Sequence, residues 1–100
     1  MTRNPNRRPT HPGKLLREVA LPEAGITQAE LARRMSVSRL TVSEIIHEKR
    51  AVTADIAHRL GRVFGNGPEL WLNLQKAVDL WEAAQSTRRE YQRIKPLRAA

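Results

Sequence analysis

Residues 27–47 hold start signals for two short helices that are separated by only a few residues. Thr27 and Glu30 form a T-x-x-E capping box, and the apolar residues Leu31, Ala32 and Met35 follow it at helical spacing. Ser38 is a second N-cap, and the helix after it carries Val42, Ile45 and Ile46 on one face. We therefore expect two short helices that pack on each other across a tight turn at Met35-Ser36-Val37.

The remaining signals predict three more helices. The first begins at Pro12 and ends at Leu21-Pro22, because a residue that precedes proline is disfavoured in the α region. Thr53 caps a fourth helix with apolar residues at Ile56, Leu60, Val63 and Phe64. Gly65-Asn66-Gly67-Pro68 ends it and starts a fifth helix at residues 68–84. No segment alternates with period two for long enough to predict a strand, so the fold class is all-α with five helices.

Three parts of the chain differ in composition. Residues 1–11 contain Arg3, Arg7 and Arg8 with two prolines and hardly an apolar side chain, which predicts a flexible basic arm. Residues 12–84 form the folded domain. Residues 85–100 form a basic tail that either extends the last helix or frays, with Arg88, Arg89, Arg93, Lys95 and Arg98 against a single Glu90.

Charge indicates the kind of partner. The 100 residues include 18 Lys and Arg against 10 Asp and Glu, a net charge of +8, which attracts polyanions and makes nucleic acid the expected partner. The absence of cysteine excludes disulfides and thiolate zinc sites. No stretch is long and apolar enough for a membrane span or a signal peptide, so we expect a cytoplasmic protein without a membrane partner.

The two helices of residues 27–47 have the dimensions of a helix-turn-helix unit, whose second helix lies in the DNA major groove. Its outward side chains can read base edges: Arg39 can pair with guanine, Glu44 can accept from cytosine, and Leu40 can meet a thymine methyl group. Phosphate contacts are expected at its flanks. The predicted DNA-binding residues are Gln28, Ser38, Arg39, Leu40, Thr41, Ser43, Glu44, His47, Lys49 and Arg50.

The fifth predicted helix carries more apolar surface than one small core requires. Leu72 and Leu80 lie off the main apolar stripe of this helix, and part of its circumference is therefore available to a second copy of the chain. Aromatic residues suit the centre of such an interface. The residues predicted for a homodimer interface are Trp71, Leu72, Leu74, Val78 and Trp81.

Enzyme motifs are incomplete in this sequence. His47-Glu48 begins like a zinc-protease motif, but position 51 is Ala where a second histidine would be needed. Gly65 and Gly67 lack the lysine of a phosphate-binding loop and are better explained by a turn. We predict no enzyme, no catalytic residues, no metal site and no cofactor.

The segment TQAELARRMSVSRLTVSEIIHEKR resembles repressors of the xenobiotic-response-element class, which implies a fold like that of lambda repressor. HPGKLLREV and AVTADIAHRLGRVFGNGPELWLNLQKAVDLWEAAQ look like the HigA antitoxin family, most distinctively in ELWLNLQKAVDLW. The resemblance covers about residues 11–85. Ser36 and Glu48 depart from it, because the family usually has glycine at both positions. Glu48 would place a negative charge beside Lys49 and Arg50.

The resemblance implies a homodimer that binds a palindromic operator in double-stranded DNA, represses its own operon and neutralises a toxin, typically a RelE-like ribonuclease. Two alternatives stay open from the residues themselves. One is a transcription regulator that has no toxin, and the other is a module whose basic surface binds a protein or RNA.

Overall fold

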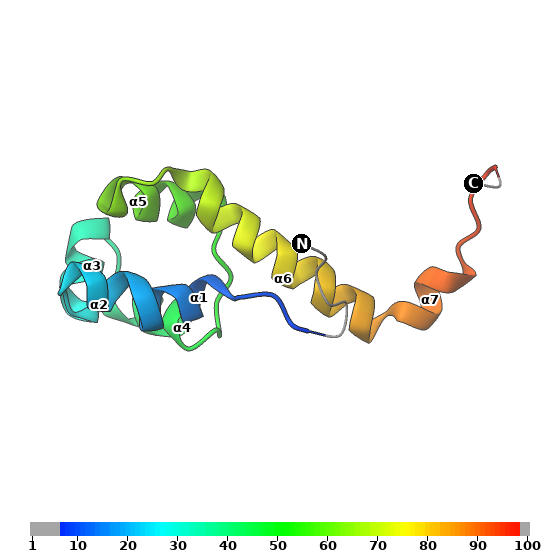
Figure 1. The fold of residues 1–100 in the computed structure, drawn as a ribbon, viewed down its shortest axis with the longest axis horizontal. Coiled ribbons are helices and arrows are strands. Elements are labelled where there is room, and N and C mark those ends of the chain that lie inside the picture. The colour runs from blue at the N-terminus through cyan, green and yellow to red at the C-terminus, as the bar shows by residue number, and fades with distance from the viewer. Residues whose placement is uncertain (1–6, 99–100) are drawn as a thin grey trace.

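A computed structural model describes residues 7–98, and every regular element in that part of the chain is helical. Figure 1 shows a compact group of helices at one end, from which a long helix leads away. The elements are α1 (Pro12–Leu15), η1 (Leu16–Ala20), α2 (Leu21–Ala24), α3 (Gln28–Met35), α4 (Arg39–Ile46), α5 (Ala54–Phe64), α6 (Pro68–Ser86) and α7 (Arg88–Arg93). The all-α fold class predicted from the sequence is confirmed, with α7 as an additional short helix.

The first predicted helix does not end at Leu21-Pro22, and that prediction is wrong. Helical structure continues through α1, η1 and α2 to Ala24. Residues 16–20 form a π-helical turn in which the Leu21 N–H donates to the Leu16 carbonyl. This wider turn carries the helix past Pro22, which has no N–H for an ordinary helical bond. The helix ends instead at Gly25, which has a φ of 67° that glycine adopts without strain.

The core joins all the helices from α1 to α6. Its most deeply buried large side chains include Leu16, Leu31, Val42, Ile45, Leu60, Trp71 and Val78. The N-terminus of α1 approaches the end of α4 so closely that a Cβ atom added at Gly13 would lie 2.0 Å from the Ile45 carbonyl oxygen. Glycine at position 13 therefore lets α1 support the helix that the sequence assigns to DNA reading.

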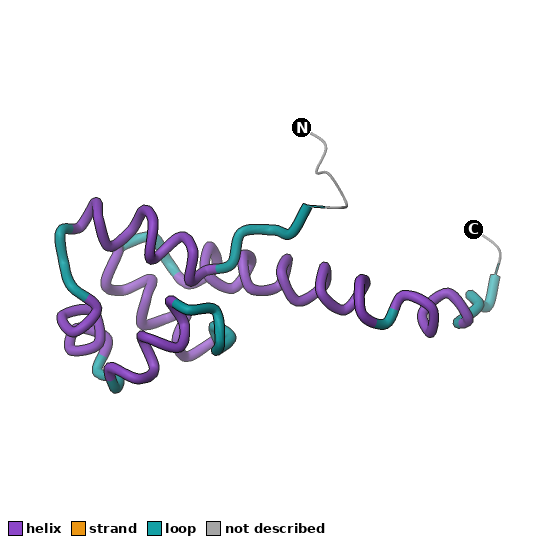
Figure 2. The backbone as a smooth tube through the Cα atoms, turned by 90° about the horizontal axis from the view of Figure 1, so that it is seen from below, coloured by secondary structure: helices purple, strands orange, loops and turns teal. Residues whose placement is uncertain are grey.

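The long helix α6 makes the molecule elongated, with principal extents of 51 × 27 × 22 Å. Figures 1 and 2 both show the N-terminal segment alongside α6, while α7 extends the chain at the far end. Arg8 is tied to α6 by an ion pair in which its Nη2 lies 2.8 Å from Glu82 Oε1. Arg8, which the sequence assigned to a flexible arm, therefore contacts the body; residues 1–6 lie outside the described part of the chain.

His11 belongs to the folded body. It is 4% exposed, and its Nδ1 accepts a hydrogen bond of 2.9 Å from the Gly13 N–H, which caps α1. Burial lowers the pKa of His11 below its ordinary value of 6.5. The neutral ring is the form that can cap the helix, because Nδ1 must be unprotonated to accept this bond.

We expect acid to destabilise the fold through His11. Since its pKa is lower in the folded chain, the unfolded chain binds more protons as the pH falls below about 6.5, and the stability contributed by the neutral ring is lost. Urea denaturation at about pH 7.5 and pH 5.5 measures this loss. His11→Asn keeps a capping oxygen and should reduce the difference, whereas replacing the exposed His58 with Gln should not. An unchanged pH dependence in His11→Asn would contradict the assignment.

Candidate nucleic-acid interface

The helices α3 and α4 form the predicted helix-turn-helix unit. Both begin at the predicted caps, since Thr27 Oγ1 accepts from the Glu30 N–H at 3.1 Å and Ser38 Oγ accepts from the Thr41 N–H at 3.1 Å. The turn between them places Ser36 at φ 58° and ψ 45°, in the left-handed region. Arg59 of α5 stabilises this turn, because its Nη1 donates to the Met35 carbonyl at 2.7 Å. A cation at a helix C-terminus also meets the negative end of the helix dipole.

Ser36→Gly is expected to raise the free energy of unfolding by about 0.5–1 kcal/mol, because glycine enters the left-handed region without a Cβ clash. Glu48→Gly is the matched comparison, since Glu48 has a φ of 62° but also forms ion pairs that glycine would remove. Its gain should therefore be smaller. Urea denaturation measures both variants, and a loss of stability in Ser36→Gly would contradict the explanation by strain.

None of the ten predicted DNA-binding residues is buried. Seven are exposed, namely Gln28, Ser38, Arg39, Leu40, His47, Lys49 and Arg50, and three are half-buried, namely Thr41, Ser43 and Glu44. Leu40 is 66% exposed, which leaves its methyl groups accessible to a partner. The apolar face of α4, with Val42, Ile45 and Ile46, points into the core.

Several predicted reading residues are already paired within the chain. The hydroxyls of Ser38 and Thr41 lie 2.9 Å apart, and His47 Nδ1 lies 2.8 Å from the Ser43 carbonyl. Glu44 Oε1 accepts from Arg50 Nη2 at 2.7 Å. Both printed bonds from Arg50 go to Oε1, so the other carboxylate oxygen of Glu44 can still accept from a base.

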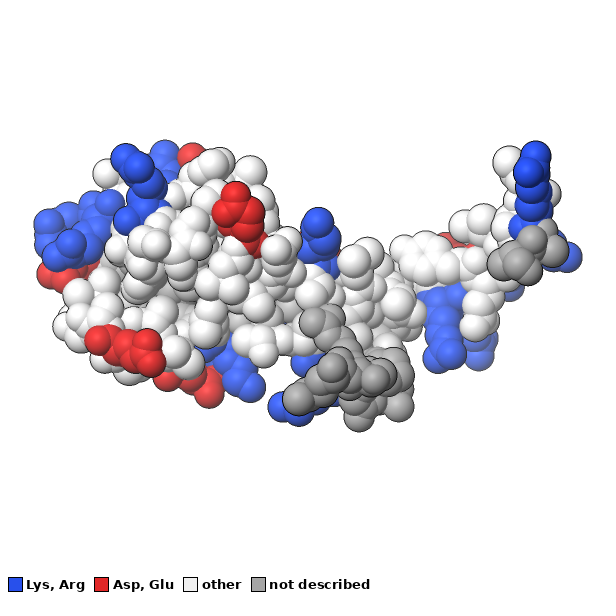
Figure 3. Space-filling view, turned by 45° about the horizontal axis from the view of Figure 1, so that its top comes forward, with Lys and Arg blue, Asp and Glu red and all other residues white. Residues whose placement is uncertain are grey.

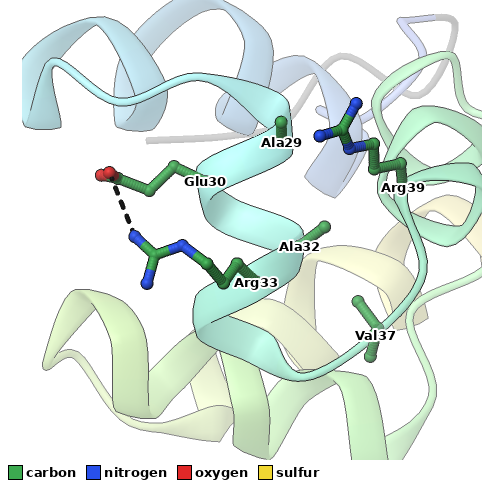
Figure 4. Close-up of a pocket in the computed structure, with 6 residues that line it drawn as sticks. All are labelled: Ala29, Glu30, Ala32, Arg33, Val37 and Arg39. Carbon is green, nitrogen blue, oxygen red and sulfur yellow. Dashed lines mark hydrogen bonds and ion pairs between the residues drawn. The ribbon is translucent and has the colours of Figure 1, made fainter.

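Arg39 and Lys49 form no ion pair with any described residue. Figure 4 shows Arg39 at the edge of a shallow hollow of about 370 Å³, where it extends toward Ala29 of α3. Arg33 lines the same hollow and is paired with Glu30 at 3.3 Å. Of these two arginines, Arg39 has the guanidinium that is free to meet an acceptor outside the chain.

The end of α4 is supported from the N-terminal helices. Arg17 Nη1 donates to the Ile46 carbonyl at 2.6 Å, and the Glu48 carboxylate pairs with Arg8 and Arg17. The hydrogen bond from Arg8 lowers the pKa of Glu48 below its ordinary value. The charge of Glu48, expected to oppose phosphate beside Lys49 and Arg50, is thus balanced by two arginines.

Figure 3 shows Lys and Arg side chains gathered at the end of the molecule that holds the helix-turn-helix unit, and again near the C-terminus. Of the three arginines within the unit, Arg33 and Arg34 are paired with Glu30. The positive field of the body is therefore smaller than the number of basic residues suggests, which increases the weight of Arg39 and Lys49.

The predicted dimer interface needs correction at two residues. Trp71 and Val78 are each 1% exposed within a single chain, so they belong to its core and are not available to a second copy. Leu72, Leu74 and Trp81 are half-buried. Leu80, which is 66% exposed, lines a hollow of about 460 Å³ on α6 together with Leu72.

Arg17, Arg59, Gly13 and Gln75 support the unit but were not singled out from the sequence. Each acts on a segment far away in the chain, as Arg59 does on Met35 and Gln75 on Val52. No local pattern marks the arginines or Gln75. Gly13 did carry a signal, because a glycine in the first turn of a predicted helix favours close approach of another backbone.

Comparison with known proteins assigns the family. A helix-turn-helix family model matches residues 16–72. The antitoxin HigA-1 of Vibrio cholerae serotype O1 is 42% identical over 95 residues, which cover 95% of this chain and 90% of the relative. The chain belongs to the HigA family. Its other relatives include transcriptional regulators of Haemophilus influenzae and Escherichia coli, at 37% and 42% identity, so the family assignment is to DNA-binding proteins and not to enzymes.

Solved structures of two similar antitoxins agree with this fold. Pseudomonas aeruginosa antitoxin HigA, solved with the higBA promoter, is 41% identical and superposes with a TM-score of 0.85 over 91% of this chain and 100% of that one. Antitoxin GraA in complex with its operator is also 41% identical, with a TM-score of 0.85 over 99% and 100% of the two chains. These two relatives were solved with DNA.

In the described part of this HigA-family chain, no group of three or more His, Cys, Asp or Glu side chains is placed to hold a metal ion. A search of the same residues for a membrane-spanning helix found no candidate.

Proposed function

We propose that this protein is a sequence-specific DNA-binding repressor that acts as the antitoxin of a type II toxin-antitoxin system and represses its own operon. The observation that carries the proposal is the exposed outer face of α4, where Arg39 and Leu40 have no partner in the core. Two similar antitoxins that superpose on this chain, HigA and GraA, were solved with a promoter and an operator respectively. A cytoplasmic location follows, because the proposed partner is the operon's own DNA.

The contacts divide into two kinds. Arg39 and Leu40 at the start of α4, with Thr41, Ser43 and Glu44 behind them, are proposed to read bases. Gln28, Ser38, His47, Lys49 and Arg50 are proposed to contact phosphates, which fixes the register of the helix in the groove. Arg50 can make such a contact while it holds Glu44, since a guanidinium has five N–H donors.

A homodimer is proposed through the exposed part of α6. Leu72, Leu74, Trp81 and Leu80 offer apolar surface there, whereas Trp71 and Val78 of the same helix belong to the core. Two copies related by a two-fold axis would present two α4 helices to a palindromic operator. Sedimentation at micromolar concentration should show a dimer, and Leu80→Asp should shift it toward monomer. A monomeric unchanged chain would refute this part.

The toxin is proposed from the family, with a RelE-like ribonuclease as the expected type. Co-expression with the product of a neighbouring gene should restore growth that the product alone arrests, and the two proteins should co-purify. A regulator without a toxin would bind its promoter but rescue nothing. A protein- or RNA-binding module would show no preference for promoter DNA.

Promoter binding is expected to weaken steeply as salt concentration rises. Each neutralised phosphate contributes about −0.9 to the slope of log K against log salt, so two cationic contacts in each copy of a dimer predict a slope of about −4. Fluorescence anisotropy with labelled promoter duplex measures it. A slope near zero would mean that Lys49 and its neighbours do not meet phosphate.

A further inference from the structure

The segment that follows α4 is held against α6 by a buried amide. Gln75 of α6 is 6% exposed, and its Oε1 accepts a hydrogen bond of 2.8 Å from the N–H of Val52, which is 3% exposed. Its Nε2 donates to Asp79 Oδ1 at 2.9 Å. Both ends of the amide are thus used, and its orientation is fixed by two partners on different elements.

A second link holds the other end of the same segment. The Arg8 guanidinium bridges Glu48, which directly follows the last turn of α4, and Glu82 of α6. Gln75, Asp79 and Glu82 are spaced four and three residues apart, so they lie on one face of α6. This face therefore contacts the segment both at Val52 and, through Arg8, at Glu48.

Lys49 and Arg50 lie between these two links. They line a small hollow of about 170 Å³ together with Gln75, Asp79 and Glu82. Their backbone is fixed at Glu48 on one side and at Val52 on the other, while both side chains remain exposed. A segment that is ordered before binding loses less conformational entropy when its side chains meet phosphate.

We propose that Gln75 is a positioning residue for DNA binding, which holds the Lys49-Arg50 segment in the conformation that contacts phosphate. The inference deepens the proposed function and rests on it. A leucine at position 75 would fill the same space but would leave the buried Val52 N–H without an acceptor, and an unsatisfied buried donor is costly enough to move the segment. Because α6 also carries the proposed dimer surface, the same bond connects that surface to the phosphate contacts.

A double-mutant cycle tests the proposal with a random-sequence duplex at low salt, because phosphate contacts do not depend on sequence. We expect Lys49→Ala to weaken binding about fivefold in the otherwise unchanged chain and less than about twofold in a chain that carries Gln75→Leu. Asn73→Ala, which alters an exposed amide on the same helix, is the matched control, and Lys49→Ala should cost the full fivefold there. Circular dichroism confirms that each variant is folded.

The proposal would be overturned if Lys49→Ala reduced the affinity for random DNA by the same factor with and without Gln75→Leu. A Lys49→Ala variant that binds normally would overturn it as well. If Gln75→Leu fails to fold, Gln75→Glu replaces it. That variant has an acceptor for Val52, but repulsion between its carboxylate and Asp79 is expected to turn the side chain away from the Val52 N–H. Lys49→Ala should then weaken binding by less than about twofold, as in Gln75→Leu. Adding Asp79→Asn supplies a donor and should restore the cost; failure to restore it would also overturn the proposal.

A parallel titration with the DNA upstream of the chain's own gene tests the specific-repressor function separately from the role of Gln75. Equal affinity of the unchanged chain for upstream and random duplexes would refute the proposed function as a specific repressor. The cycle on random DNA would still decide the role of Gln75.

Discussion

Trp71→Ala is expected to lower the free energy of unfolding by about 3–5 kcal/mol, a large part of the roughly 5–15 kcal/mol that stabilises a domain of this size. Trp71 is 1% exposed, and its ring centroid lies 5.7 Å from that of Phe64. Its Nε1 donates to Asn66 Oδ1 at 3.0 Å, which ties the turn between α5 and α6 to the core. The substitution both leaves a cavity in the core and removes the hydrogen bond to Asn66.

Urea denaturation followed by circular dichroism measures the effect. Leu40→Ala is the control, because Leu40 is 66% exposed and its loss should change stability by less than about 0.5 kcal/mol. A Trp71→Ala variant nearly as stable as the unchanged chain would show that Trp71 is not core. It would then return to the list of candidates for the dimer interface.

Arg39→Ala is expected to weaken operator binding by about 1–3 kcal/mol while binding to random DNA falls only slightly. Arg39 is exposed at the first position of α4, directly after the Ser38 cap, and none of the described residues forms an ion pair with it. Its fork can donate to two acceptors on one guanine. Stability should change by no more than about 0.5 kcal/mol, since alanine is favourable at an exposed helical position.

Titrations against operator and random duplexes, with each base pair of the half-site varied in turn, measure this effect. Preference should be lost at one base pair per half-site. Lys49→Ala should instead weaken binding to all sequences alike and flatten the salt dependence. Equal losses on operator and random DNA in Arg39→Ala would make Arg39 a phosphate contact and would change the orientation of α4 in the groove.

Local signals predicted the elements that carry the function. Thr27, Ser38 and Thr53 were identified as caps from their residue type and the apolar spacing behind them, and each side chain caps its helix in the structure. A cap depends on atoms within three residues, so the sequence contains the information. The family resemblance, and no local signal, marked Ser36 and Glu48 as positions that usually hold glycine, and both have positive φ.

The features that were missed depend on contacts between distant segments. The helix passes Pro22 because a π turn forms at residues 16–20, where Leu16 is fixed in the core. Trp71 and Val78 resemble interface residues in an apolar stripe, and only packing shows that they are enclosed by their own chain. The pairing of Glu44 with Arg50 spans six residues and a turn, so helical periodicity does not reveal it.

A footprint of the purified chain on the DNA upstream of its own gene tests whether α4 reads an operator. We predict protection of two half-sites related by two-fold symmetry, with centres about one helical turn of DNA apart or a multiple of it. That protection should be lost in Arg39→Ala at concentrations where the unchanged chain binds. No protected site, or a site protected equally by Arg39→Ala, would contradict the claim that α4 reads the operator.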